Sequence, residues 1–156
     1  MPGSASANDD VVRAWSGMLR LHAQLVPLID AELVRATGMP LRWYDVLLEL
    51  EAAPDRRLRM VELGDAVVLS RTRVSRVVDE LIEAGFVTRL PNPDDGRSAF
   101  AAISPAGRRA FRRAAPVYLD RIRTHLGARV SRRDAAALRD ILERALDAEV
   151  TATTAS

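Results

Sequence analysis

Three arginines lie close together at Arg71, Arg73 and Arg76, in a segment with helical periodicity. Its hydrophobic residues recur at spacings of three and four and fall in one sector of a helical wheel, whereas Arg76 points away from that sector. The helix macrodipole favours acids at the beginning of a helix, so arginines there cost stability unless an anionic partner compensates for them. A guanidinium can donate two hydrogen bonds to a guanine edge or to a phosphate. The segment therefore predicts a helix whose first turns contact nucleic acid.

The acidic residues of this segment come later, at Asp79, Glu80 and Glu83. We expect them to lie away from the floor of the DNA groove and to limit indiscriminate phosphate contact. On one helix alone, such charges could equally be ordinary solvated side chains, and the elements before and after it favour the DNA interpretation. We expect Ser70 to cap the helix, because serine accepts a hydrogen bond from a free backbone N–H. The predicted DNA contacts are Ser70, Arg71, Thr72, Arg73, Ser75 and Arg76.

A second candidate contact lies in the turn cluster PNPDDGR. It separates two short segments, 86–90 and 98–103, that contain aromatic and β-branched residues, which predicts a β-hairpin. Arg97 then lies at or beside the hairpin tip, and Asp95 could hold its guanidinium in position. An arginine on such a wing can enter a narrow minor groove. The hairpin alone, without the neighbouring helix, would favour the interpretation of Arg97 as a solvated loop residue.

The elements that position these groups follow from periodicity and from turn residues. A long amphipathic helix begins near residues 9–10, and a short second helix begins around Pro40. A third helix covers 59–66, and the fourth ends at Gly85. After the hairpin, one helix begins at 104–105 and another at Ser131. The fold class is therefore mainly α with a small β-hairpin wing: a winged helix-turn-helix flanked by further helices.

The composition excludes several classes of protein. The chain has 156 residues, 48% of them hydrophobic, and no cysteine, so disulfides and thiolate metal sites are ruled out. Two histidines that are far apart do not suggest a metal centre, and we expect no metal and no cofactor. No apolar run approaches the ~20 residues that span a bilayer, and the N-terminus lacks the features of a signal peptide, so we expect a cytoplasmic protein.

The charge is unevenly distributed. The formal net charge is only +2, yet residues 70–113 carry nine arginines and five acidic residues. A basic segment in a slightly acidic frame indicates a local anionic partner. Four more arginines, at 108, 109, 112 and 113, could contact phosphates or pair with acids of the frame. The sequence shows no phosphate-binding glycine loop, no serine elbow and no HExxH motif, so we do not expect an enzyme.

Three stretches resemble the MarR (multiple antibiotic resistance regulator) family. They are LRWYDVLLEL, LSRTRVSRVVDELIEAGFVTRL and PDDGRSAFAAISPAGRRAF, between Leu41 and Phe111. The family's Asp-x-Arg wing signature falls on Asp95 and Arg97. The outer helices extend the resemblance over roughly residues 10–150.

This resemblance implies a homodimeric transcription regulator, acting as a repressor, that binds a pseudo-palindromic duplex operator. It also implies a small phenolic or anionic effector. The expected organisation is a disordered N-terminus (1–9), a dimerisation helix (10–37), a DNA-binding lobe (38–104), C-terminal dimerisation helices (105–150) and a disordered tail (151–156). The expected dimer-interface residues are Val11, Val12, Leu19, Tyr118, Leu138 and Leu142.

Candidate effector-pocket residues are the aromatic and histidine side chains of the predicted helices. Each has a simpler role available, in the core or in the interface between subunits. They are Trp15, His22, Trp43, Tyr44 and Tyr118. The alternative function is a winged-helix module that contacts an acidic protein partner, and a preferred duplex site would distinguish the two.

Overall fold

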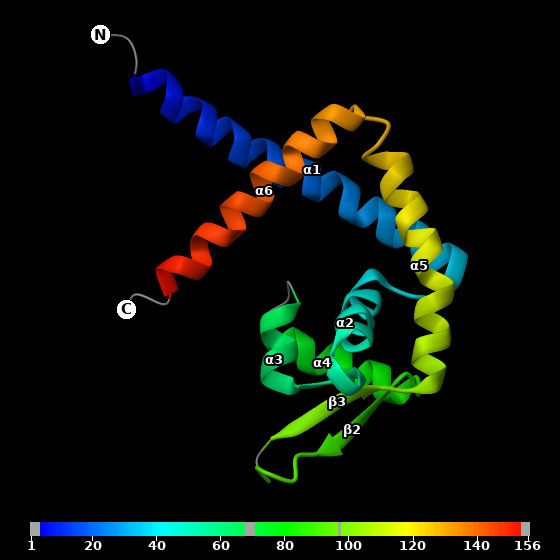
Figure 1. Cartoon of the computed structure of the whole chain (residues 1–156). Helices are drawn as coiled ribbons and strands as arrows, with labels where there is room; N and C mark the ends of the chain where they lie inside the picture. The colour runs from blue at the N-terminus through cyan, green and yellow to red at the C-terminus, as the bar shows by residue number, and fades with distance from the viewer. Residues whose placement is uncertain (1–3, 68–70, 97, 154–156) are drawn as a thin grey trace. The chain divides into compact units, whose positions relative to one another are not determined.

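The chain divides into two compact units, Met1–Leu119 and Asp120–Ser156 (Figure 1). The computed structural model describes residues 4–67, 71–96 and 98–153, and the side chains of 9–67, 73–96 and 98–147. The first unit contains α1 (Ser4–Thr37), α2 (Leu41–Ala52), the 3-10 turn η1 (Pro54–Arg56), β1 (Arg57–Arg59), α3 (Met60–Ala66), α4 (Arg71–Glu83), β2 (Val87–Pro91), β3 (Ala99–Ile103) and most of α5 (Pro105–His125). The end of α5 and α6 (Arg132–Thr153) form the second unit.

The predicted hairpin is present, and a third strand joins it. β2 and β3 pair antiparallel, with Val87 opposite Ile103 and Leu90 opposite Phe100. β1 pairs with the other edge of β3, so the sheet order is β1-β3-β2. The sequence analysis had begun the third helix at Arg59, whereas α3 begins one residue later and Arg59 ends β1. Three residues are too few to show the alternating pattern of a strand. The stability of β1 comes from its pairing with β3, which is distant in the sequence.

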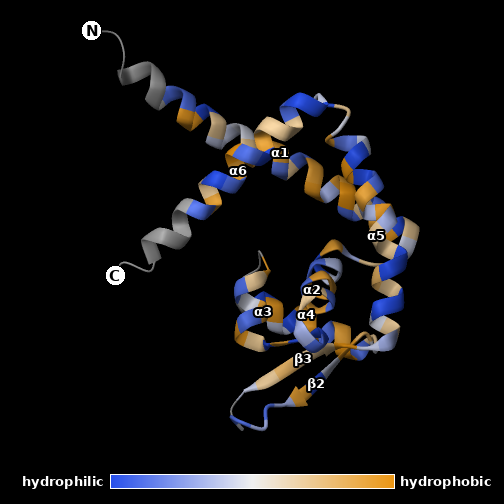
Figure 2. Cartoon of the chain, viewed as in Figure 1, coloured by the Kyte–Doolittle hydropathy of each residue, from blue (hydrophilic) through white to orange (hydrophobic). Residues whose placement is uncertain are grey.

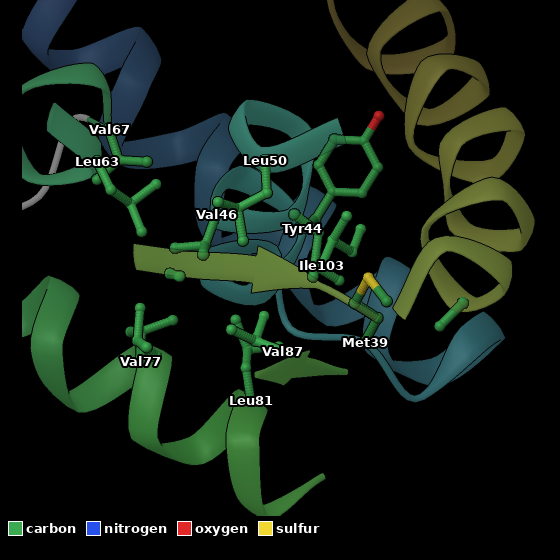
Figure 3. Close-up of a cluster of buried hydrophobic side chains, with 14 of the residues drawn as sticks. Met39, Tyr44, Val46, Leu50, Leu63, Val67, Val77, Leu81, Val87 and Ile103 are labelled. Carbon is green, nitrogen blue, oxygen red and sulfur yellow. The ribbon is translucent and has the colours of Figure 1, made fainter. Parts of the chain in front are cut away.

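The core of the first unit lies where α2, α3 and α4 meet the sheet. Side chains from these three helices converge on β3 (Figure 3). Leu47, Leu50, Leu63 and Leu81 have no exposed surface. The hairpin of β2 and β3 extends beyond the helices (Figure 1). Packing against a rigid core therefore fixes both α4 and the base of the wing.

The joint between α4, β2 and α5 is unusually close. Gly85 ends α4 with a positive φ of 73°, and the N–H of Phe86 donates to the carbonyl of Leu81. The Ser104 hydroxyl donates to the Gly85 carbonyl and accepts from the N–H of Gly107, which confirms the predicted cap of α5. A Cβ at Gly107 would lie 2.2 Å from the carbonyl oxygen of Phe86. Only glycine therefore allows α5 to begin here.

The outer helices are longer than the sequence predicted. α1 begins at Ser4, so the expectation that residues 1–9 lie outside a helix is wrong from that residue on. α6 continues to Thr153, two residues beyond the expected start of the tail at 151. The added residues are mainly alanine, serine and threonine, with no glycine or proline to stop a helix. The predicted capping box is confirmed: Asp134 N–H donates to the Ser131 hydroxyl at 3.1 Å, and Ser131 donates to the Asp134 carboxylate.

Apolar residues recur along the described parts of both outer helices, α1 and α6 (Figure 2). In α1, Val11, Val12, Trp15, Met18 and Leu19 are exposed, whereas Leu25, Ile29 and Leu33 are buried. In α6, no side chain that the structure describes is buried. Within the described residues, no helix is both long enough and apolar enough to cross a bilayer.

Candidate nucleic-acid interface

The helix α4 is held by one apolar stripe. Val74, Val77, Val78 and Leu81 are buried, as the periodicity predicted. Arg73, Ser75 and Arg76 are exposed, so the first turns of α4 offer donors to solvent. Ser70 lies outside the described residues, as do the side chains of Arg71 and Thr72, and their predicted contacts stay predictions. The arrangement can present guanidinium and hydroxyl groups to a groove of duplex DNA.

The helix before α4 completes the helix-turn-helix. α3 buries Leu63, and the Glu62 carboxylate accepts a hydrogen bond from the backbone N–H of Arg59 at 2.9 Å. This contact satisfies a free donor at the beginning of α3. α3 packs against α4, although residues 68–70 between them lie outside the described part of the chain.

Two of the three acids of α4 have partners within the lobe. Asp79 accepts a hydrogen bond from Arg89 of β2 at 3.1 Å. Glu80 accepts hydrogen bonds from Arg42 and Trp43 of α2. The bond from Trp43, followed by that from Arg42, lowers the pKa of Glu80. From the sequence, these acids are expected either to limit phosphate contact or to be ordinary solvated charges. Their contacts cannot be predicted from local periodicity, because the partners lie 10 to 38 residues away.

The turn of the wing is organised around a buried asparagine. Asn92 is 4% exposed, and its side-chain amide donates to the Ser98 hydroxyl at 2.7 Å. Its side-chain oxygen accepts from the N–H of Asp94 at 3.1 Å. The sequence analysis used Asn92 only as part of a turn cluster, although an asparagine between two prolines signals such a side-chain-to-backbone contact. Asp95 is exposed, whereas Arg97 lies outside the described residues, so their expected pairing stays a prediction.

An open groove of about 650 Å³ lies between α3, α4 and the wing. Ser75 and Asp95, both predicted DNA contacts, line it together with Arg89. The structure therefore brings the recognition helix and the wing to one concave surface. The remaining lining residues are Arg59, Met60, Val61, Glu62, Ser98 and Ala99.

Two of the arginines at the beginning of α5 pair with an acid of the frame. Arg108 contacts the Glu51 carboxylate at 3.0 Å, and Arg112 contacts it at 3.4 Å. Arg56 approaches the same group at 3.5 Å. Burial raises the pKa of Glu51, but the hydrogen bond and the charge of Arg108, with the charges of Arg56 and Arg112, outweigh burial and lower it. For Arg108 and Arg112, the structure therefore favours pairing with an acidic residue of the chain over contact with DNA phosphates.

The candidate effector residues do not form one site. Tyr44 and Tyr118 do meet, with ring centroids 4.6 Å apart. Trp43 contacts Phe86 and Glu80 instead. Trp15 and His22 are exposed on α1. Among the described residues, no group of three or more His, Asp or Glu side chains is arranged to hold a metal ion.

An acid with a perturbed pKa lies beside the two tyrosines. Burial raises the pKa of Asp45 to about 6, and the charges of Glu49 and Asp30 contribute to the rise. Burial also raises the pKa of Tyr44 and of Tyr118, and the charge of Asp45 adds to both shifts. The sequence analysis missed Asp45, because an acid on an amphipathic helix carries no sign of its burial.

Four of the six expected interface residues are exposed in a single chain. Val11, Val12 and Leu19 are each more than half exposed, and Leu142 is 39% exposed. Leu138 and Tyr118 are partly buried. These apolar side chains can be covered by a further protein surface.

Comparisons with known proteins place this geometry among DNA-binding regulators. The sequence matches the model of the MarR family over residues 37–98. Sco3205, a MarR family transcriptional regulator from Streptomyces coelicolor solved in complex with DNA, is 31% identical; the match has a TM-score of 0.78 and covers 86% of this chain and 85% of that one. A MarR family transcriptional regulator from Silicibacter pomeroyi is 30% identical, with a TM-score of 0.72 and coverage of 88% and 97%.

A third structure shares the fold at lower identity. AbsC, another MarR family transcriptional regulator from Streptomyces coelicolor, is 23% identical, with a TM-score of 0.77 and coverage of 88% and 93%. No curated protein matched the sequence. The predicted fold, a mainly α winged helix-turn-helix with flanking helices, is thereby confirmed.

Proposed function

Because the chain belongs to the MarR family of transcriptional regulators, we propose that it binds a pseudo-palindromic operator in duplex DNA as a homodimer. The observation that carries the proposal is the exposed cationic beginning of α4, where Arg73 and Arg76 project from a helix whose opposite face is buried. A helix-turn-helix inserts this part of its second helix into the major groove. The DNA present in the Sco3205 structure supports a duplex as the partner.

Each predicted contact has a role in this proposal. Arg73 and Arg76 donate to base edges, and Ser75 donates to a base or to a phosphate. Ser70, Arg71 and Thr72 take part at the beginning of the helix. Arg97, held by Asp95, enters the minor groove from the wing. The groove that Ser75 and Asp95 line together supports a shared binding surface.

The dimer places two such surfaces on one duplex. A two-fold axis relates them, so the operator has two half-sites about one helical turn apart. The exposed apolar residues of α1 and α6, among them Val12, Leu19 and Leu142, support a second copy of the chain as the partner of these helices.

Regulation completes the proposal. The protein represses transcription in the cytoplasm, associated with the nucleoid while it is bound to DNA. When a small phenolic or anionic effector binds to the protein, the affinity for the operator falls and the protein leaves the DNA. Tyr118, whose ring is partly exposed beside the buried Tyr44, is one aromatic side chain on which such a ligand can stack.

Binding measurements with charge-removing variants test the proposal. Arg73→Ala and Arg76→Ala should each cost about 1–3 kcal/mol on a duplex enriched from a random pool, and should relax base choice at one position per half-site. Fluorescence anisotropy titrations of labelled duplexes measure the loss. Arg35→Ala, which removes an exposed arginine at the end of α1, is the matched control and should bind like the parent.

Two outcomes would contradict the proposal. If both α4 variants bind the enriched and random duplexes like the parent, these residues do not read bases. If the parent binds no duplex even at low salt, the alternative function, a module that contacts an acidic protein, replaces DNA recognition.

A further inference from the structure

Glu80 accepts three hydrogen bonds from the beginning of α2. Its Oε2 atom lies 2.7 Å from Trp43 Nε1, 3.0 Å from Arg42 Nη2 and 3.2 Å from Arg42 Nε. All three donors come from two adjacent residues, and all reach one carboxylate oxygen. Glu80 is therefore a directional link between α2 and the recognition helix.

The donor side of this link is itself fixed. The Trp43 ring meets Phe86 edge to face, with centroids 6.0 Å apart at 88°. Phe86 comes directly after the turn that ends α4. The N–H of Leu41, two residues before Trp43, donates to the Asp30 carboxylate of α1 at 2.7 Å. Trp43 is thus held from two sides, and Glu80 meets a donor that has little freedom to move.

Apolar packing alone defines the rotation of α4 about its axis less tightly than these hydrogen bonds do. The buried stripe of α4 consists largely of valines, and its attraction to the core is non-directional. A charged hydrogen bond has a defined length and direction. Arg76 lies one turn before Glu80 on the same helix, and its charge contributes to lowering the pKa of Glu80. A change in the rotation of α4 would therefore move Arg76 relative to any base that it contacts.

We propose that Trp43 and Arg42, acting through Glu80, are positioning residues that set the sequence specificity of the recognition helix. This inference rests on the proposed function, because specificity is defined only for a chain that reads DNA. Non-specific binding depends on phosphate contacts and tolerates small changes in helix orientation, whereas base readout does not. Removal of the link should therefore reduce discrimination between duplexes rather than general affinity for DNA.

The test compares Glu80→Ala with Glu83→Ala in the full-length chain. Both variants remove one negative charge from α4, but Glu83 is exposed and has no hydrogen bond or ion pair within the described residues. Dissociation constants are measured for an enriched duplex and for a random duplex at two salt concentrations. Glu80→Ala should lose about threefold to tenfold in the ratio of the two affinities, because the link is partly exposed and screened by solvent, while binding to random DNA changes less than about twofold.

Trp43→Phe tests the donor side, because it removes the indole N–H and keeps an aromatic ring beside Phe86. It should lower the affinity ratio in the same direction as Glu80→Ala, and the double variant should lose little more than either single one. If Glu80→Ala and Glu83→Ala behave alike, or if both affinities fall together, the positioning role is wrong.

A spectroscopic arm separates this inference from the proposed function. The chain has two tryptophans, so Trp15→Phe leaves Trp43 as the only one. In that background, Glu80→Ala should shift the emission of Trp43 in the absence of DNA, and Glu83→Ala should not. If Glu80→Ala leaves the emission spectrum unchanged, the contact between Glu80 and Trp43 is wrong. If Glu80→Ala shifts the spectrum but the parent protein binds no DNA, the contact stands, and only the proposed function and the specificity role that rests on it are wrong.

Discussion

The DNA-binding lobe and the outer helices differ in how much apolar surface one chain can bury. In the lobe, Leu47, Leu50, Leu63 and Leu81 are completely buried around one sheet. In α6, by contrast, the described side chains include no buried one, and Leu146 is 67% exposed. The lobe has a core of its own, so its packing explains its stability. The outer helices carry apolar residues that this core does not use, which is what a dimerisation element requires.

The largest effect should come from the core of the lobe. Leu50→Ala removes a fully buried side chain from α2 and should cost about 2–5 kcal/mol of unfolding free energy, because it leaves a cavity. Urea denaturation followed by circular dichroism measures the loss. Leu48→Ala on the exposed side of the same helix should cost less than about 1 kcal/mol, and equal losses would contradict the contrast within α2.

A charge on α6 should act on assembly instead of folding. Leu142→Glu places a carboxylate in each half of the proposed two-fold interface and should weaken the proposed dimer by at least about a hundredfold, because a buried charge without a partner is costly. Sedimentation velocity over a concentration series measures the change. Arg144→Glu alters a polar position of α6 and should leave the dimer intact. A parent and a Leu142→Glu variant that sediment alike would reject α6 as the interface.

The perturbed acid of α2 predicts a pH-dependent effect of intermediate size. The pKa of Asp45 is raised from 3.8 to about 6 in the folded chain, so folding disfavours its charged form. Well below pH 3.8 the group is protonated whether the chain is folded or unfolded, and its contribution vanishes. The destabilisation grows as the pH rises through 4 to 6 and is complete above that range.

Asp45→Asn should therefore stabilise the protein by about 1–3 kcal/mol at pH 8 and by almost nothing at about pH 3. Thermal denaturation at several pH values measures this difference. The exposed Asp10→Asn is the control. A gain that is the same at both pH values would mean that the charge of Asp45 is not its cause.

The smallest effect should come from the pair that joins the wing to the recognition helix. Asp79 and Arg89 are 3.1 Å apart, but both side chains are largely exposed. A double-mutant cycle with Asp79→Ala and Arg89→Ala should give a coupling of about 0.5 kcal/mol that decreases with salt. If the coupling free energy of this pair exceeded the loss of unfolding free energy in Leu50→Ala, core packing would not be the larger contribution to stability.

The sequence predicted the parts of the fold that depend on local patterns. The spacing of Val74, Val77, Val78 and Leu81 identified the buried face of α4, and Ser104 and Ser131 identified the caps of α5 and α6. Each of these signals lies within one or two helical turns, so neighbouring residues are sufficient to reveal it. The orientation of Arg73 and Arg76 towards solvent followed from the same pattern.

Contacts between distant segments could not be predicted in this way. β1 exists because Leu58 lies opposite Ala101, more than 40 residues later. Trp43 was assigned to an effector pocket, and only the fold places its indole against Glu80. The burial of Asp45 and the arginines around Glu51 also depend on the packing of separate helices. Periodicity specifies which face of a helix is buried, but it does not specify which other element covers that face.

Selection of duplexes from a random pool by the full-length protein tests the central claim most directly. After several rounds of binding and sequencing, the account predicts enriched duplexes with two inverted half-sites about one helical turn apart. A parallel selection with Arg76→Ala should retain this spacing and lose preference at one base position in each half-site. A pool that remains random, or that is enriched for a motif without two-fold symmetry, would contradict the claim that a dimer reads DNA through α4.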